Sequence, residues 1–340
     1  MRDSSNRSNQ RDFFLTNTLI VGVGMAVGNR PVENSELIER FNLPADWIVT
    51  RTGVVRRYYV DSRQRTSDLA TAACQQALSR AGVAVNEIDL LICATMTPEM
   101  SCPATAVLTA AKLGARPIAA FDLNAACTGF LAALQSADAL MRVGAAQTAL
   151  VVGADVLSEI IDQDDPRVAS LFGDGAAAVV LRRVESNQIG CLAQHLGSDG
   201  HSWPLIYHPE SERDLPPGHE PPPRWKQLRM EGKQVFRFAV EKLTELIPQA
   251  VAEAGLQMAE VRHFVLHQSN LRIIERVCEN LAIPRERCPV TIDRYGNTSA
   301  ASIGIGLCEL HERGELRRGD VVVMAAVGGG LTWGVSVWRL

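Results

Sequence analysis

The sequence predicts an α/β protein built from two similar halves, and three observations support this prediction. Short apolar runs typical of buried strands alternate with longer segments of helical period. The helical segments of the first half each end at a glycine, a common helix stop. Residues 81–97 can also be laid over residues 254–270 without a gap. The alternation implies a largely parallel sheet, and the repeat implies a duplicated unit with a site where its halves meet.

Predicted strands and helices alternate along the chain. Apolar runs bounded by turn residues predict strands over 18–27, 89–96, 117–123 and 148–157. Apolar residues at helical spacing predict helices over 67–82, 101–114 and 127–144. In the second half a helical pattern over 235–255 comes first, and residues 291–330 repeat strand, small-residue turn, long helix and strand. Proline-rich residues 202–226 predict a long loop that either covers a site or links elements.

These patterns divide the chain into three parts. We expect a flexible polar tail over residues 1–16, an N-terminal half over 17–185 and a C-terminal half over 186–340. The tail lacks the apolar core of a secretory signal, and no run approaches the ~18 apolar residues that a membrane helix needs. A cytoplasmic protein with no membrane contact is therefore expected.

Composition excludes several classes of function. The 340 residues are 46% hydrophobic and 21% charged, with a net charge of −4, which is ordinary for a globular protein. No basic stripe is available to neutralise a nucleic-acid backbone. The eight cysteines include no CxxC pair, which argues against a zinc or thioredoxin-like site and favours scattered, reduced thiols. No metal is expected.

One cysteine lies where a nucleophile would be useful. Cys127, in the stretch DLNAACTGF, follows a predicted strand and begins a predicted helix. The unpaired N–H groups and the dipole of a helix N-terminus favour a thiolate, which lowers a cysteine pKa. Its small neighbours leave room for a substrate. Position alone does not decide the matter, because a buried cysteine is more often structural.

Three further features fall at comparable places. His267 ends a predicted strand, where α/β sheets place ligand-binding groups, although a lone histidine there is more often structural. Asn297 lies in a turn that the repeat equates with the Cys127 turn, although an asparagine before a helix is most often an N-cap or turn residue. Glycines 328–330 suit an oxyanion hole, a phosphate cradle or a tight turn, but lack a P-loop lysine.

The motifs together resemble β-ketoacyl-acyl-carrier-protein synthase III, a family of thiolase-like condensing enzymes. They are NAACTGF, LHQSNLRI, YGNTSAAS and GGGLTWG, in this order, with DWIVTRTGV and LFGDGAAAVVL in support. The resemblance implies a thiolase-like fold, a duplicated five-layered αβαβα architecture. It also implies a homodimer that starts fatty acid synthesis by a decarboxylating Claisen condensation of an acyl-CoA with malonyl-acyl-carrier protein. No cofactor is implied beyond the CoA and phosphopantetheine thioesters, which are substrates.

The resemblance assigns roles residue by residue. Cys127 would carry the acyl group, His267 and Asn297 would hydrogen-bond the enolate, and the N–H groups of Cys127 and Gly329 would form the oxyanion hole. The positions that match the family's CoA and pantetheine contacts are Trp47, Arg51, Arg167, Gly232 and Asn270. Cys102 and Phe172 match the acyl pocket, and Arg237 and Arg272 match basic positions that dock the carrier protein.

Two departures from the family pattern bear on the substrates. Cys102 stands where acetyl-preferring members commonly carry a phenylalanine lent by the dimer partner, which predicts a primer longer or bulkier than acetyl. Glu279 and Asn280 occupy positions that are often lysine, which predicts a weaker or differently distributed carrier-protein dock. A specialised condensing or acyl-transfer enzyme of secondary metabolism, of quinolone or polyketide type, is therefore the main alternative.

Two other classes fit less well. The order Cys, His, Asn and the 140 residues from Cys127 to His267 also suit a papain-like protease. The local signature of that family and a secretory segment are both missing. A non-catalytic partner subunit is disfavoured because the Cys–His–Asn set is intact.

Overall fold

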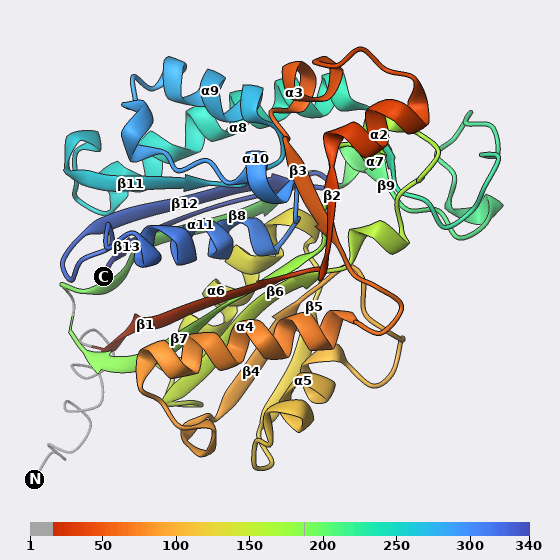
Figure 1. Cartoon of the computed structure of the whole chain (residues 1–340). Coiled ribbons are helices and arrows are strands. Elements are labelled where there is room, and N and C mark those ends of the chain that lie inside the picture. The colour runs from red at the N-terminus through yellow and green to blue at the C-terminus, as the bar shows by residue number, and fades with distance from the viewer. Residues whose placement is uncertain (1–15, 187) are drawn as a thin grey trace, which may run out of the picture.

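The computed structural model describes residues 16–186 and 188–340 (Figure 1). The predicted tail over 1–16 lies outside the described residues except for Thr16, at which the first strand begins.

Two sheets lie between three layers of helices, as the sequence predicted (Figure 1). In spatial order the first sheet contains β1 (Thr16–Val27), β7 (Gly175–Glu185), β6 (Thr148–Asp155), β4 (Leu90–Ala94) and β5 (Ala119–Leu123). The second contains β11 (Val261–Leu266), β12 (Val321–Gly328), β13 (Thr332–Arg339) and β8 (Gly190–Ser198). In both sheets the parallel pairs, β4 with β5 and β6, and β11 with β12, lie beside antiparallel neighbours.

The helices divide between an inner layer and two outer layers. The outer face of the first sheet packs on α4 (Thr66–Ala81) and α5 (Thr105–Leu113), and that of the second on α8 (Gly232–Glu253) and α9 (Leu271–Asn280). Between the sheets lie α6 (Gly129–Arg142) and α11 (Ala301–Glu312), whose apolar side chains form one core with both sheets. Helix α5 begins later than the predicted residue 101, because Pro103 disfavours helical backbone just before it.

The duplication holds element by element. The spatial order β4, β6, β7 and β1 in the first sheet corresponds to β11, β12, β13 and β8 in the second. Short helices η1 (Val85–Glu87) and η6 (Met258–Glu260) occupy equivalent positions in the gap-free overlay. One expected element is absent among the described residues: the strand predicted from residue 291 is the helical turn α10 (Ile292–Tyr295), so β5 has no counterpart and the second sheet has four strands.

A buried carboxylate joins the two halves. Asp155, the last residue of β6, accepts hydrogen bonds from the Met96 N–H (2.8 Å) and from the Thr95 and Thr97 hydroxyls. Its other oxygen accepts the Ala300 N–H (3.3 Å), at the start of α11 in the second half. Burial raises the pKa of Asp155, while these donors act to lower it. The carboxyl ends of β4 and β6 are thereby held against the first turn of α11.

An excursion from the first half covers one end of the molecule. It contains β2 (Arg30–Glu33), α2 (Asn34–Phe41), α3 (Trp47–Thr52) and β3 (Arg56–Tyr59). Fully buried Arg57 holds it in place: one guanidinium nitrogen donates to Val32 O, and another to Asn34 Oδ1 and Ser170 O at 2.7 Å each. Burial lowers the pKa of Arg57 to about 10. The short helix α7 (Pro166–Ala169) ends directly before Ser170, whose carbonyl oxygen accepts one of the Arg57 hydrogen bonds.

The proline-rich segment is less irregular than predicted. It contains 3₁₀ turns η4 (Gly200–Leu205) and η5 (Glu212–Asp214), and β9 (Ile206–Tyr207), which pairs with β10 (Arg229–Met230). Two further 3₁₀ turns, η3 (Leu157–Glu159) and η7 (Arg285–Arg287), connect other elements. The β9–β10 pair closes the base of the loop.

Replacement of Arg57 tests how the excursion is held. Arg57→Met should lower the free energy of unfolding by about 3 kcal/mol, because three acceptors lose a charged donor. Arg56→Met, on the same strand, changes a side chain that lies over the ring of Tyr58 and should cost less than about 1 kcal/mol. Urea unfolding followed by tryptophan fluorescence measures both. Equal losses in the two variants would contradict this role of Arg57.

Candidate active site

The nucleophile candidate lies on a tight turn between β5 and α6. Asn124 Oδ1 accepts the Ala126 N–H at 3.0 Å, and Ala126 has left-handed backbone (φ 47°). This turn places Cys127 within η2 (Ala126–Thr128), directly before α6. The predicted position at a helix start is therefore correct.

The same turn recurs in the second half with a different outcome. Asn297 Oδ1 accepts the Ser299 N–H at 2.9 Å, and Ser299 has left-handed backbone (φ 51°) just before α11. Asn297 thus corresponds to Asn124, and Ala300 to Cys127. Of these equivalent turns, the first half therefore contributes the Cys127 thiol to the cavity and the second half contributes the Asn297 amide. Since Oδ1 of Asn297 is occupied, its remaining polar group is the Nδ2 donor.

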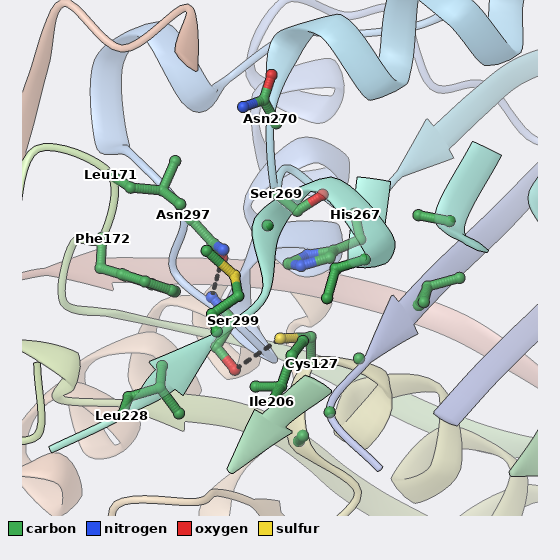
Figure 2. Close-up of a pocket in the computed structure, with 18 of the residues that line it drawn as sticks. Cys127, Leu171, Phe172, Ile206, Leu228, His267, Ser269, Asn270, Asn297 and Ser299 are labelled. Atoms are coloured by element: carbon green, nitrogen blue, oxygen red, sulfur yellow. Dashed lines mark hydrogen bonds between the residues drawn. The ribbon is translucent and has the colours of Figure 1, made fainter. Parts of the chain in front are cut away.

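Three predicted residues meet at one cavity. Figure 2 shows Cys127, His267 and Asn297 around it, and Gly329 lines it as well. His267 directly follows β11, and its N–H donates to Ala325 O of β12 at 2.8 Å. Its Nδ1 lies 2.6 Å from Ser302 Oγ, whereas Nε2 is buried with no partner among the residues that the structure describes. Burial lowers the pKa of His267 to about 4, so the ring is neutral at physiological pH.

The thiol of Cys127 is desolvated rather than ionised. Burial raises its pKa to about 11; the Ser299 hydroxyl, 3.6 Å from the sulfur, and the N–H groups of Cys127 and Gly329 lower it only in part. The sequence-based expectation of a lowered pKa is wrong, because burial and the nearby Asp155 charge outweigh these donors. Cys127 is therefore a thiol at neutral pH, facing two backbone N–H groups.

The glycine-rich turn is clamped to the nucleophile turn. A Cβ on Gly328 would lie 2.8 Å from Cys127 N, so only glycine permits this approach. Thr332 Oγ1 lies 2.9 Å from Thr128 Oγ1, and both hydroxyls contact Ala125 O. These contacts join the turn that carries Gly329 to the turn that carries Cys127, and the N–H groups of both residues interact with the thiol. Such a pair of donors suits an oxyanion hole, which was one of the expectations for this turn.

The cavity is lined mainly by apolar side chains. Phe172, Gly232 and Asn270, which the resemblance placed at the site, line it. Aliphatic side chains surround the space beside the thiol; they are Leu157, Leu171, Ile206, Leu228 and Met230. This lining suits an acyl chain.

The mouth of the cavity is basic. Arg51, Lys233 and Arg272 line a depression that shares Gly232 and Asn270 with the cavity. Asn270 Nδ2 donates to Arg51 O at 3.0 Å. The Arg51 guanidinium lies 4.5 Å from the centre of the Trp47 ring. A phosphorylated ligand could meet an aromatic face and three cations here.

Other residues from the resemblance lie away from the cavity. Arg167 pairs with Asp165 (2.6 Å) and lines a neighbouring depression. Arg237 is exposed and pairs with Glu241 at 2.8 Å. Cys102 is exposed and is not part of the cavity lining contributed by its own chain. Their predicted roles stay predictions.

Sequence reasoning missed several residues of the site. Ser299 and Ser302 lie within the quoted motif YGNTSAAS, where they counted only as small residues. Met96 Sδ lies 3.7 Å from Ser299 Oγ, and nothing in its local sequence marks it. Ile206 belongs to the proline-rich segment, and no sequence pattern predicted that its strand β9 pairs with β10.

Within 16–186 and 188–340, no three His, Cys, Asp or Glu side chains are grouped so as to hold a metal ion. No described helix combines the length and apolar character required to cross a membrane.

Comparison with known proteins identifies the family. Residues 121–200 match the family described as 3-oxoacyl-[acyl-carrier-protein] synthase III, and residues 251–340 match its C-terminal part. The β-ketoacyl-[acyl-carrier-protein] synthase III of Rhodospirillum centenum is 42% identical over 95% of this chain and 98% of the relative. The chain belongs to the β-ketoacyl-[acyl-carrier-protein] synthase III family. It is an acyltransferase-type condensing enzyme with a thiolase-like fold.

Solved structures of the family agree with the fold. The synthase III of Thermus thermophilus superposes with a TM-score of 0.90 at 40% identity, covering 95% of this chain and 99% of that one. The priming β-ketosynthase of the R1128 polyketide pathway superposes with a TM-score of 0.87 at 33% identity, covering 95% and 96%. The protease reading of the Cys–His–Asn order is thereby excluded.

The protonation state of Cys127 can be tested by alkylation. With a pKa of about 11, the rate of reaction with iodoacetamide should rise about tenfold per pH unit from pH 7 to 10. Peptide mass spectrometry on a Cys102→Ser background, which removes the exposed thiol, follows Cys127 alone. A plateau below pH 9 would show a stabilised thiolate and contradict this assignment.

Proposed function

We propose that this enzyme starts fatty acid synthesis by joining an acyl-CoA primer to malonyl-acyl-carrier protein in a decarboxylating Claisen condensation. The observation that carries the proposal is the convergence of a thiol, two backbone N–H groups and two side-chain donors on one apolar cavity.

The first half-reaction forms a thioester on Cys127. The sulfur attacks the carbonyl carbon of the acyl-CoA, the oxyanion faces the N–H groups of Cys127 and Gly329, and CoA leaves. The thiol proton is lost to solvent and CoA takes one up, so free CoA and acyl-Cys127 are the products. Splitting the reaction in this way frees the cavity for the second substrate.

The second half-reaction uses donors rather than a base. Loss of CO₂ from the malonyl thioester leaves its electron pair as an enolate, whose oxygen accepts hydrogen bonds from His267 Nε2 and Asn297 Nδ2. The enolate carbon attacks the acyl carbonyl, the bond to Cys127 breaks, and the thiolate takes a proton from solvent. Neutral His267 suits this step, since its pKa of about 4 keeps it from abstracting a proton.

The primer is longer or bulkier than acetyl. The cavity that contains Cys127 is also lined by Leu157, Leu171 and Phe172, whose apolar side chains suit a chain longer than a two-carbon group. The resemblance has the dimer partner closing this pocket, and Cys102 of the partner subunit would leave more space there than a phenylalanine. Each further methylene buried is worth about 0.8 kcal/mol of binding.

A second copy of this chain is the expected partner. Strand β5 is an edge of the first sheet, and exposed Phe121 lies on it. Met100 and Val107, also exposed, extend the apolar surface near Cys102. Pairing of two β5 edges would cover unpaired backbone groups and bring Cys102 to a partner.

The carrier protein docks on the basic mouth. Lys233 and Arg272 lie beside the cavity entrance, and Arg237 is already paired with Glu241. Arg276 is likewise paired with Glu279, at 3.3 Å. The dock is therefore centred on Lys233 and Arg272.

An enzyme of secondary metabolism is the alternative. The structural likeness to a polyketide-priming ketosynthase and the paired arginines favour it. Activity with malonyl-acyl-carrier protein of fatty acid synthesis supports the main proposal, and activity only with another malonyl thioester supports the alternative. Intact mass after mixing with acyl-CoA separates both from a binding subunit, which forms no adduct; the adduct should vanish in Cys127→Ala.

Primer choice can be shifted at one position. In competition between acetyl-CoA and octanoyl-CoA, we expect the native enzyme to favour the longer substrate. Cys102→Phe should move the ratio of kcat/KM toward acetyl by about tenfold or more. Cys102→Ser, which keeps the side chain small, should leave the ratio close to native. A native preference for acetyl-CoA would refute the assigned primer.

Carrier-protein docking can be tested with two arginines. Arg272→Ala should raise KM for malonyl-acyl-carrier protein about three- to tenfold at low salt, and less at high salt, because an exposed charge pair is screened. Arg237→Ala should raise KM less than about twofold, since Glu241 already pairs with Arg237. A larger rise in KM for Arg237→Ala than for Arg272→Ala would place the dock on α8, away from the mouth.

A further inference from the structure

A buried hydroxyl contacts the face of His267 that points away from the cavity. Ser302 Oγ, in the first turn of α11, lies 2.6 Å from His267 Nδ1. Both side chains are buried, with 1% and 3% of their residue surfaces exposed. The N–H of Gln268 also points at Ser302 Oγ, at 3.4 Å. Among the described residues the imidazole ring has no other polar partner.

The protons around this hydroxyl can be counted. The Gln268 N–H can only donate, so it places a hydrogen toward Ser302 Oγ. The hydroxyl has one proton, and the acceptor found for it within the described part of the chain is His267 Nδ1. An imidazole nitrogen that accepts a hydrogen bond carries no proton in the neutral ring. The ring proton then lies on Nε2, which lines the cavity without a partner among the described residues.

The segment that presents His267 is itself rigid. The amide of buried Gln268 makes four hydrogen bonds: its Nε2 donates to Leu266 O and Pro289 O, and its Oε1 accepts the N–H groups of Thr291 and Ile292. The Gln268 N–H is therefore held in its direction toward Ser302. Loss of this hydrogen bond would cost free energy at both the ring and the hydroxyl, because both are buried away from water.

We propose that Ser302 is a positioning residue for the condensation, whose hydroxyl donates to His267 Nδ1 and so fixes the ring as the Nε2–H tautomer. His267 is thereby committed to donating a hydrogen bond into the cavity and cannot act as a base toward Cys127. The inference rests on the proposed function, since it assigns His267 to the enolate step. It predicts that Ser302 matters for decarboxylation and not for acylation.

A matched pair of variants separates this role from general packing. Ser302→Ala removes the donor. Thr298→Val, four residues earlier in the same turn region, removes a buried hydroxyl that has no partner in the ranges described. Ser302→Thr keeps the hydroxyl. Three readouts are taken for each: tautomer of His267 by 15N chemical shifts in histidine-labelled protein, decarboxylation of malonyl-acyl-carrier protein, and acylation of Cys127 by acyl-CoA.

The expected results differ between the readouts. Native enzyme, Thr298→Val and Ser302→Thr should show the proton of His267 on Nε2 and similar decarboxylation rates. Ser302→Ala should mix the tautomers and lower kcat for decarboxylation about tenfold or more, as loss of a positioned donor does, with little change in KM. Acylation should stay within about threefold of native.

Two outcomes would overturn the inference. The first is a native His267 with its proton on Nδ1, a measurement that holds even if Ser302→Ala fails to fold. The second is unchanged decarboxylation in folded Ser302→Ala. The variant His267→Ala distinguishes failure of the positioning role from failure of the proposed function. If His267→Ala abolishes decarboxylation while Ser302→Ala does not, only the positioning role of Ser302 fails. If His267→Ala leaves decarboxylation intact, the proposed function itself fails.

Discussion

The buried carboxylate of Asp155 is the interaction on which the site depends. It lies at the end of β6 and accepts from the 95–97 loop of its own half and from the Ala300 N–H of the other half. The first turn of α11, which follows Ala300, carries Ser302, while Ser299 and Asn297 directly precede it. A carboxylate in this place is costly unless several donors meet it, so it holds those donors in one arrangement. Asp155 thereby ties the loop that follows β4 to the start of α11, directly after the Asn297 turn.

The chemistry around the thiol relies on dipoles rather than on charges. Burial raises the pKa of Cys127 and lowers that of His267, so both are neutral when a substrate enters. Neutral groups with fixed hydrogens suit a reaction in which negative charge appears first on an enolate and then on a tetrahedral oxygen. The backbone N–H groups, the Asn297 amide and the imidazole can meet this charge without reorganising. An ionised cysteine–histidine pair would instead favour proton transfer.

In the proposed function, several residues that contact the substrates come from segments outside the strand and helix that flank Cys127. The excursion held by Arg57 brings Trp47 and Arg51 to the mouth, and the loop closed by β9 and β10 brings Ile206 and Leu228 to the acyl space. Ion pairs on α8 and α9 neutralise arginines that would otherwise widen the basic surface. In the proposed function the catalytic groups lie on the duplicated core, whereas Trp47, Arg51, Ile206 and Leu228 come from segments outside it. Primer and carrier preference can therefore change while the chemistry is kept.

The sequence by itself determined the α/β class, the duplication and the four motifs, because periodicity and turn residues are local properties. Glycines 82, 114 and 144 end their helices with positive φ as predicted, and Cys127, His267 and Asn297 meet at one cavity. Only the tertiary structure decided the protonation of Cys127, since desolvation depends on neighbours far along the chain. It also decided the helical turn at 292–295 in place of a strand and the contact of Ser302 with His267. Those features depend on contacts between residues far apart in the sequence, such as Gln268 with Ile292, which no local pattern encodes.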